Sequence, residues 1–156
     1  MRYLTLRRQS GATVVEMALV APVFLLILLA LVELSLMFFT TLTMQYAVRE
    51  GARYAITGQS NLDPGTGSQQ RYAAIIESIR SNSLGMYEKV APVISVNGTR
   101  YASTGYTNGM FGAAGDIIVL QLDCDWKVTT PMLAQLFTNG RYRFTVGATM
   151  RNEYFP

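Results

Sequence analysis

The fold of this chain is decided by the stretch Arg7-Arg8-Gln9-Ser10-Gly11-Ala12-Thr13-Val14-Val15-Glu16 and by the apolar run from Met17 to Val32 that follows it. The run contains one proline and no charged residue. A helix needs about 20 apolar residues to cross roughly 30 Å of hydrocarbon, and that length, counted from Ala12, ends at Leu31. The sequence therefore predicts a membrane-spanning helix whose two ends are marked by Glu16 and Glu33.

The positive charge of the chain is concentrated before this helix. Arg2, Arg7 and Arg8 account for the whole net charge of +3, because residues 12–156 hold as many acidic as basic side chains. Basic residues that flank a membrane helix favour the cytoplasmic side, so we expect a cytoplasmic N-terminus and the segment after the helix outside. The basic balance thus indicates membrane orientation and no nucleic-acid partner.

A basic leader, Gly11, a glutamate five residues later and a membrane-length helix are the parts of a class III signal peptide. Such a signal is cut before its hydrophobic segment, which then stays in the mature protein. A secretory signal peptide has an apolar core of roughly 7–15 residues with a small-residue site after it. Here the run is longer and no Ala-x-Ala tripeptide follows it. A signal anchor that is never cut remains an open alternative.

The helical pattern continues beyond the membrane span. Apolar or small residues recur at spacings of three and four, at Leu34, Met37, Phe38, Thr41, Met44, Val48, Ala52 and Ala55. Gly58 is the expected stop. A single helix over residues 12–56 would be roughly 65 Å long, so its outer half must pack on its own head domain or on neighbouring subunits. Pro22 predicts a kink or a locally melted turn near Ala18–Pro22.

The rest of the chain predicts a small head domain. Gln69–Asn82 follows helical spacing, and strands are expected at Pro92–Val96, Ile118–Val128 and Tyr142–Met150, with a helical turn at Pro131–Phe137. The fold class is therefore α+β: a long N-terminal hydrophobic helix, then helices packed on one face of a three- or four-stranded antiparallel sheet. The expected organisation is a leader peptide at 1–11, a transmembrane and assembly helix at 12–56 and an extracytoplasmic head at 57–156.

Three segments carry a resemblance to a known family, in the order Gly11-Ala-Thr-Val-Val-Glu16-Met-Ala-Leu-Val-Ala-Pro22, Ala47-Val-Arg49-Glu50-Gly51-Ala52-Arg53-Tyr-Ala55 and Ala148-Thr-Met-Arg151-Asn-Glu153. The first is similar to the opening G-x4-E-F-A-L-V-x-P of the TadE-like family, the minor pilins (pseudopilins) of the tight-adherence, type IVb pilus. Met17 stands where an aromatic residue is usual. The second resembles the family's A-x-R-E-G-A-R segment, and the third resembles its C-terminal A-x-x-R-x-E.

The resemblance implies that a prepilin peptidase, a membrane aspartyl protease, cuts between Gly11 and Ala12. The new Ala12 amine would then lie near Glu16, the fifth mature residue. The resemblance further implies a minor pilin that takes part in assembly or priming of the pilus, anchored in the inner membrane with its head outside and able to enter the extracellular fibre. Its partners would be the lipid bilayer, the peptidase, other major and minor pilins and the pilus assembly platform. The alternative is an uncleaved single-pass membrane assembly factor of a secretion or pilus system, and leader cleavage distinguishes the two.

The sequence offers little for catalysis. It has no histidine and one cysteine, Cys124, so it provides no disulfide framework, Cys/His zinc cluster or His-based triad. We therefore expect no enzyme and no cofactor. Asp123 and Asp125 share a strand face, where a cation site is an alternative to an ordinary solvated face, and Asp116 is expected to close the turn into that strand. Cys124 and Trp126 are expected in the core, with an intermolecular disulfide as the alternative for Cys124.

Two further segments have two interpretations each. The aromatic residues of the loop Ala102–Gly115 could form an adhesive tip, or the loop could fold back on the sheet. Arg49, Glu50 and Arg53 could form pairs along the helix worth about 0.3–0.5 kcal/mol each, or contact neighbouring subunits. The candidates for helix and interface contacts are thus Pro22, Glu33, Arg49, Glu50 and Arg53.

Overall fold

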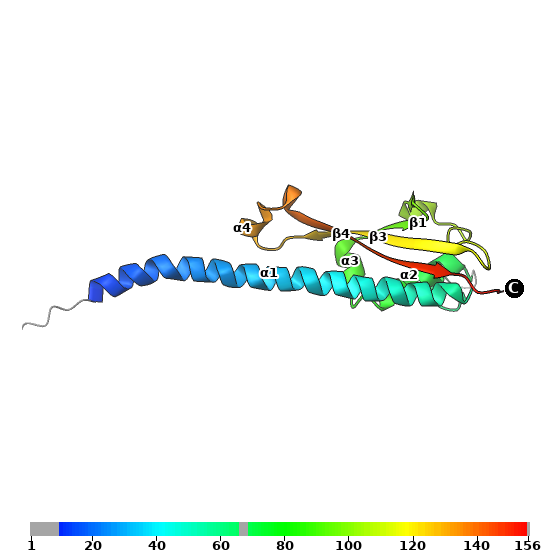
Figure 1. Ribbon diagram of the computed structural model, residues 1–156, viewed down its shortest axis with the longest axis horizontal. Coiled ribbons are helices and arrows are strands. Elements are labelled where there is room, and N and C mark those ends of the chain that lie inside the picture. The colour runs from blue at the N-terminus through cyan, green and yellow to red at the C-terminus, as the bar shows by residue number, and fades with distance from the viewer. Residues whose placement is uncertain (1–9, 66–68, 156) are drawn as a thin grey trace, which may run out of the picture.

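The structure, a computed structural model, describes residues 10–65 and 69–155. The predictions made for the basic leader fall outside the described residues, at Arg2, Arg7 and Arg8. One long helix, α1 (Ser10–Ile56), runs along the elongated molecule, and the remainder, called the head here (residues 57–155), covers only its C-terminal half (Figure 1). This is the expected α+β architecture of a long apolar helix followed by helices on a small antiparallel sheet.

The two halves of α1 differ in burial. Side chains from Thr13 to Val32 are exposed or half-exposed, whereas the C-terminal half has a buried stripe at positions three or four apart, namely Glu33, Met37, Thr40, Met44, Ala47, Val48, Gly51, Ala52 and Ala55. This spacing places the stripe on one face of the helix. Leu34 and Phe38, which belong to the helical spacing noted in the sequence, lie beside this stripe and are 49% and 61% exposed.

Pro22 does not interrupt the helix. The helical assignment is continuous from Ser10 to Ile56, so the locally melted turn expected near Ala18–Pro22 is wrong. A proline removes one backbone N–H and crowds the preceding turn, yet a helix accommodates this by bending. Figure 1 shows α1 curving near its N-terminal end, in the region that contains Pro22.

Four strands form one antiparallel sheet in the order β2-β1-β3-β4, with β1 at Val93–Val96, β2 at Thr99–Tyr101, β3 at Ile117–Lys127 and β4 at Arg141–Arg151. β3 and β4 pair along their whole length, with Ile117 opposite Arg151 and Lys127 opposite Arg141. The predicted alternation of β3 is confirmed, because one face is buried, at Ile118, Leu120, Leu122, Cys124 and Trp126.

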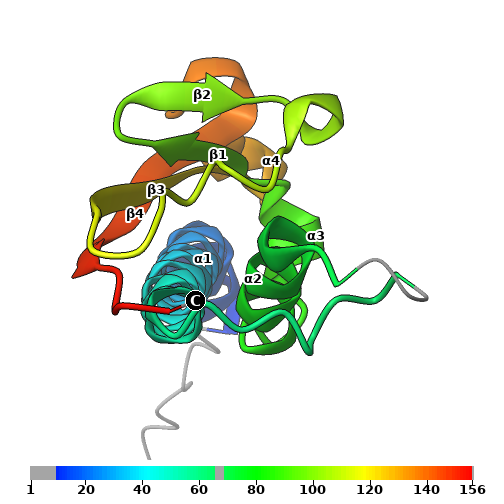
Figure 2. The same cartoon turned by 90° about the vertical axis from the view of Figure 1, so that its right-hand side faces the viewer.

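Two helices lie beside α1 beneath the sheet, α2 (Arg71–Ser81) and α3 (Met86–Val90) (Figure 2). The predicted helix over Gln69–Asn82 corresponds to α2, whose Ile75 and Ile79 are fully buried. Gly51 of α1 allows α2 to approach closely, because a Cβ at that position would overlap the side chain of Ile79. The sequence pattern missed α3, since five residues are too few to show a helical period.

The loop between β2 and β3 folds back on the sheet. Phe111 is fully buried, and Tyr106 is half-buried against Tyr72 of α2, with ring centroids 6.2 Å apart. This loop therefore does not present its aromatic residues as an exposed tip. Asp116 closes the turn as expected, since its Oδ2 accepts a hydrogen bond from the Ala113 N–H at 2.7 Å. β2 was missed by the sequence pattern because it has only three residues.

Candidate assembly surface along α1

The N-terminal half of α1 is an apolar cylinder with no protein packed on it. Among the described residues, α1 is the one helix long and apolar enough to cross a membrane, judged by length and composition, and none of its most apolar stretch is buried. Leu19 is 71% exposed and Phe24 is 60% exposed. Monomeric soluble proteins rarely expose apolar patches larger than a few hundred Å². This surface therefore requires lipid or other helices around it.

Gly11, Ala12 and Glu16 lie at the free end of this cylinder. Gly11 is exposed, and a Cβ placed on it would meet nothing within 4 Å. Ala12 and Glu16 are four positions apart in the sequence, which is about one turn of an α-helix. Glu16 is exposed, and its carboxylate forms no ion pair with any residue in 10–65 or 69–155.

Glu33, by contrast, is only 3% exposed and is held by the head. Its Oε1 accepts a hydrogen bond from the Thr129 N–H at 3.0 Å. Its Oε2 accepts bonds from the Thr130 N–H at 3.2 Å and the Thr130 hydroxyl at 3.0 Å. The buried indole N–H of Trp126 also approaches this carboxylate, but its geometry falls short of a hydrogen bond. Glu33 thus fastens the end of β3 to the middle of α1, which the sequence pattern did not foresee.

The segment from Ala47 to Ala55 is where α1 packs most closely on the head. Its small residues face inward, with Ala47 and Ala55 fully buried and Ala52 4% exposed. Its charged residues face outward. Arg53 Nη1 and Glu50 Oε1 form an ion pair at 3.3 Å across one helical turn, and the Arg53 side chain is 77% exposed, so this pair contributes little to stability.

A groove with basic walls runs beside this segment. Arg49 is exposed and forms no ion pair within the part of the chain that the structure describes. It lines an open groove together with Arg53 of α1 and Arg151 of β4. The structure therefore brings together basic residues of the second and third sequence motifs. Arg53 is paired with Glu50, and Arg151 donates a hydrogen bond from Nε to the Gly115 carbonyl at 3.3 Å, so Arg49 is the guanidinium of this groove that is most available to a partner.

The C-terminal motif closes the head onto the end of α1. Asn152 is 2% exposed, and its Nδ2 donates hydrogen bonds to the carbonyls of Phe111 and Ala113, both at 2.9 Å. The Glu153 N–H donates to the carbonyl of Ile56 at 3.0 Å. Carbonyls in the last turn of a helix have no partner within the helix, so this contact caps α1. The segment thus has a structural role, which comes from the Asn152 side chain and the Glu153 backbone.

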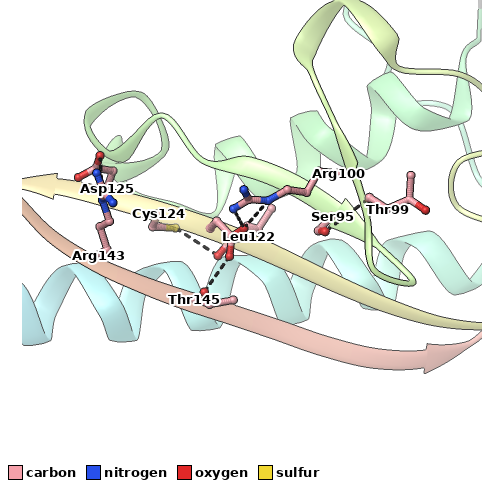
Figure 3. A network of polar contacts seen from close by, with 9 residues as sticks. Ser95, Thr99, Arg100, Leu122, Cys124, Asp125, Arg143 and Thr145 are labelled. Carbon is pink, nitrogen blue, oxygen red and sulfur yellow. Dashed lines mark hydrogen bonds and ion pairs between the residues drawn. The ribbon is translucent and has the colours of Figure 1, made fainter.

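The outer face of β3 carries paired charges (Figure 3). Arg100 of β2 donates from its guanidinium to Asp123, with Nε 3.1 Å from Oδ2, and the Thr145 hydroxyl donates to Oδ1 at 2.7 Å. The bonds from Arg100 and then Thr145 lower the pKa of Asp123. Asp125 pairs with Arg141 Nη1 at 3.2 Å. Basic side chains therefore occupy the positions that a cation would need, and the described residues contain no cluster of three or more potential metal ligands.

Cys124 and Trp126 lie on the buried face of the same strand, as expected. Cys124 is 2% exposed, and burial raises the pKa of its thiol to about 12. A thiol that is both inaccessible and protonated at neutral pH is a poor nucleophile. The structure therefore favours the core interpretation of Cys124 over an intermolecular disulfide.

A helix with a bare apolar half and a small head packed on its other half fits a pilin-like membrane protein. Comparison with family models places the match in the same part of the chain: residues 11–53 match the model of the TadE-like protein family. This confirms the resemblance over the first motif and most of the second, while the third motif lies outside the matched residues. The pilin family is in general non-catalytic. Among curated proteins and among solved structures, none matches the chain.

Proposed function

We propose that this chain is a minor pilin, or pseudopilin, of a tight-adherence type IVb pilus. A prepilin peptidase cuts it between Gly11 and Ala12, and the subunit then resides in the inner membrane with its N-terminus cytoplasmic and its head outside. From there it takes part in assembly or priming of the fibre together with other major and minor pilins and the assembly platform. The observation that carries this proposal is the bare N-terminal half of α1, which continues without interruption into a half that the head covers.

The length of the bare half supports a membrane location. From Ala12 to Glu33, at a rise of about 1.5 Å per residue, α1 extends roughly 30 Å, which equals the thickness of the hydrocarbon core. The same surface serves both stages of the proposed function, since helices packed in a fibre can replace lipid around it. A helix that only anchored a protein would not need the Gly11–Glu16 arrangement at its cytoplasmic end.

Glu16 is proposed to act in association between subunits. A carboxylate at the centre of a bilayer costs up to about 3 kcal/mol on insertion scales, and less near the interface. Cleavage after Gly11 would create a free amine on Ala12, one helical turn from Glu16. The amine of this subunit or of an adjacent one could neutralise the carboxylate, and in the dry environment of packed helices that attraction strengthens.

The test of the proposed function is the N-terminus and location of the native protein. Its intact mass should correspond to a chain that begins at Ala12, and it should be found in sheared pili as well as in the membrane. A Gly11→Val variant should keep its leader and remain in the membrane, whereas Ser10→Ala, a change at the adjacent position, should be processed normally. A native protein that still begins at Met1 would instead support the uncleaved assembly factor.

The orientation can be tested separately. Protease added to spheroplasts should digest residues 57–156 while the bilayer protects the N-terminal half of α1. Complete protection of the head in intact spheroplasts, with digestion only after lysis, would show that the orientation inferred from Arg2, Arg7 and Arg8 is wrong.

A further inference from the structure

The hairpin between β3 and β4 ends in an uncharged, apolar tip, defined here as residues 128–140. The tip contains no Asp, Glu, Lys or Arg. It includes the short helix α4 (Pro131–Ala134) and the turn η2 (Thr138–Gly140). Met132 is 65% exposed and Leu136 is 78% exposed, the largest exposed fraction of any large aliphatic side chain in the described residues. Other large apolar side chains of the head, such as Leu84 and Ile117, are also well exposed. The tip differs because it exposes two of them within one segment that has no charged residue, and such a segment calls for a partner.

The tip is an ordered structure. The Val128 N–H donates to the Gly140 carbonyl at 3.0 Å and closes its neck. Phe137 packs edge-on against Tyr142, with centroids 6.4 Å apart, and Leu133 also packs against the core. Because these side chains face inward, the exposure of Met132 and Leu136 on the other side is a fixed feature of the fold.

Glu33 sets the position of the tip along α1. Its carboxylate accepts hydrogen bonds from Thr129 and Thr130, the second and third residues of the tip. As described above, Glu33 lies roughly 30 Å along the helix from Ala12, at the outer edge of the hydrocarbon. Figure 1 shows α4 lying further toward the N-terminal end of α1 than the strands β1 and β3 do. The tip therefore projects from the head toward the proposed membrane surface.

Basic residues surround the neck of the tip. Lys127 and Arg141 face each other as the last pair of the β3–β4 ladder, and both are exposed, although Arg141 also pairs with Asp125 at 3.2 Å. Arg143 follows two positions later on the same strand face, with a side chain 67% exposed. An apolar element in the interface with basic residues just above it is the pattern of segments that rest on a membrane containing anionic lipids.

From these observations we infer that the hairpin tip is a second membrane contact of this protein, in which Met132 and Leu136 enter the outer headgroup–acyl boundary and Lys127 and Arg141 lie among the phosphates. The inference rests on the membrane span assigned to α1 in the proposed function. The tip then fixes the tilt and rotation of the head over the bilayer before the subunit is extracted into a fibre. A neighbouring subunit is the rival occupant, and the experiment below separates the two.

The experiment uses the full chain in vesicles of phosphatidylcholine with a minority of phosphatidylglycerol. Single cysteines are placed in a Cys124→Ala background and labelled with an environment-sensitive fluorophore. Leu136→Cys and, independently, Met132→Cys report on the tip. Val23→Cys reports on the span, and Asn108→Cys, in the exposed loop at the other end of the head, is the matched control for a solvated surface. Quenching by lipid-borne nitroxides is compared with quenching by aqueous iodide.

The tip labels should be quenched by nitroxides near the lipid carbonyls, at a depth of about 5–10 Å, and should be shielded from iodide, whereas the Asn108 label should be open to iodide. If the Val23 label is in the acyl region but both tip labels are as open to iodide as Asn108, the tip inference is overturned and the span stands. If the Val23 label is also open to iodide, both fail. In a third outcome, the tip labels are shielded from iodide but are not quenched by nitroxides, and the shielding disappears when the protein is diluted in lipid. This outcome would identify a neighbouring subunit as the partner of the tip and overturn the lipid contact.

Discussion

Two glutamates on the same helix, Glu16 and Glu33, have opposite environments. Glu33 is almost fully buried, and three hydrogen bonds from Thr129 and Thr130 satisfy its carboxylate. Glu16 is exposed on a helix surface that is otherwise apolar, and the described part of the chain supplies no cation to it. The comparison shows that a carboxylate in an apolar helix can find its hydrogen-bond donors within its own chain. Glu33 does so, whereas Glu16 does not within the described residues.

The same difference extends to the two halves of α1. The C-terminal half reaches its final packing within one chain, because α2 and the sheet cover its buried stripe. The N-terminal half leaves large apolar side chains such as Leu19 and Phe24 without any cover. One half is therefore part of a folded domain, and the other is completed only by lipid or by other subunits.

The largest expected effect follows from Glu16→Ala. The variant should insert and be cut after Gly11, yet its pilus fraction should fall roughly tenfold or more, since losing about 1.4 kcal/mol of association is already tenfold. The stability of the head should stay within about 0.5 kcal/mol, as for surface changes in general. Co-purification with partner pilins and intact mass are the measurements. Glu88→Ala, which removes an exposed carboxylate of the head, should leave piliation normal. Normal piliation by correctly processed Glu16→Ala would remove the assembly role.

Glu33→Ala should show the opposite result and weaken the head. It leaves the partly buried N–H groups of Thr129 and Thr130 without their acceptor, and the loss of such an acceptor costs about 1–3 kcal/mol where water does not replace it. We expect a decrease of roughly 2–4 kcal/mol in the free energy of unfolding. Urea unfolding of the full chain in detergent, followed by the fluorescence of its single tryptophan, measures it. Glu33→Gln retains one acceptor oxygen and should lose less. An unchanged midpoint in both variants would mean that Glu33 does not hold the head.

A pair of valine substitutions tests the two halves of α1 directly. Gly51→Val places a side chain into Ile79, which is fully buried, and overpacking of this kind costs about 1–3 kcal/mol. Ala18→Val adds the same type of side chain to the bare half, where it meets no protein, and should leave the unfolding midpoint unchanged. The two midpoints are compared under the same detergent conditions. Equal effects in both positions would contradict the division of α1 into packed and bare halves.

The smallest effect is expected at a partly exposed carboxylate, Asp123. Its pKa is lowered by the hydrogen bonds from Arg100 and Thr145, so its contribution to stability is present above the unfolded pKa of about 3.9 and is lost as pH falls through the folded pKa. Its side chain is 30% exposed, so Asp123→Asn should cost at most about 1 kcal/mol at neutral pH. Urea midpoints measured from neutral pH to below about pH 4 should converge with those of the native chain. A constant difference across that range would show that Asp123 does not act through its charge.

Much of the fold follows from local patterns in the sequence. Long periodic segments are specified by their own side chains, which is why α1, α2 and the strands β3 and β4 could be predicted from apolar spacing. Short elements lack a full period, so α3 and β2 were missed. The sequence pattern did not show which face of α1 the head would cover, because in a helix that is apolar on all sides the residues facing lipid look the same as those facing the head.

The candidate site was less predictable, for a related reason. The sequence identified Glu16 and Glu33 as the two carboxylates of the helix, and their spacing placed them at its two membrane ends. It gave no signal that Thr129 and Thr130 would meet Glu33, since they are 96 and 97 residues away and neither is distinctive in type. Small residues such as Gly51 had a structural explanation only once α2 was seen to lie against them.

The pairing of the first helix with the last strand also determines the order of events when the protein is made. Gln45 of α1 donates a hydrogen bond to the Gly147 carbonyl of β4, which is synthesised 102 residues later. Contacts between such distant parts of a chain form slowly. Under the proposed function, α1 would therefore lie in the bilayer before the rest of the chain has been exported. During that interval the stripe that will be buried is uncovered. Its residues in the last turns of α1 are mostly alanine and glycine, which present little apolar area. The uncovered stripe of an incompletely folded subunit therefore offers little apolar surface for association with other chains.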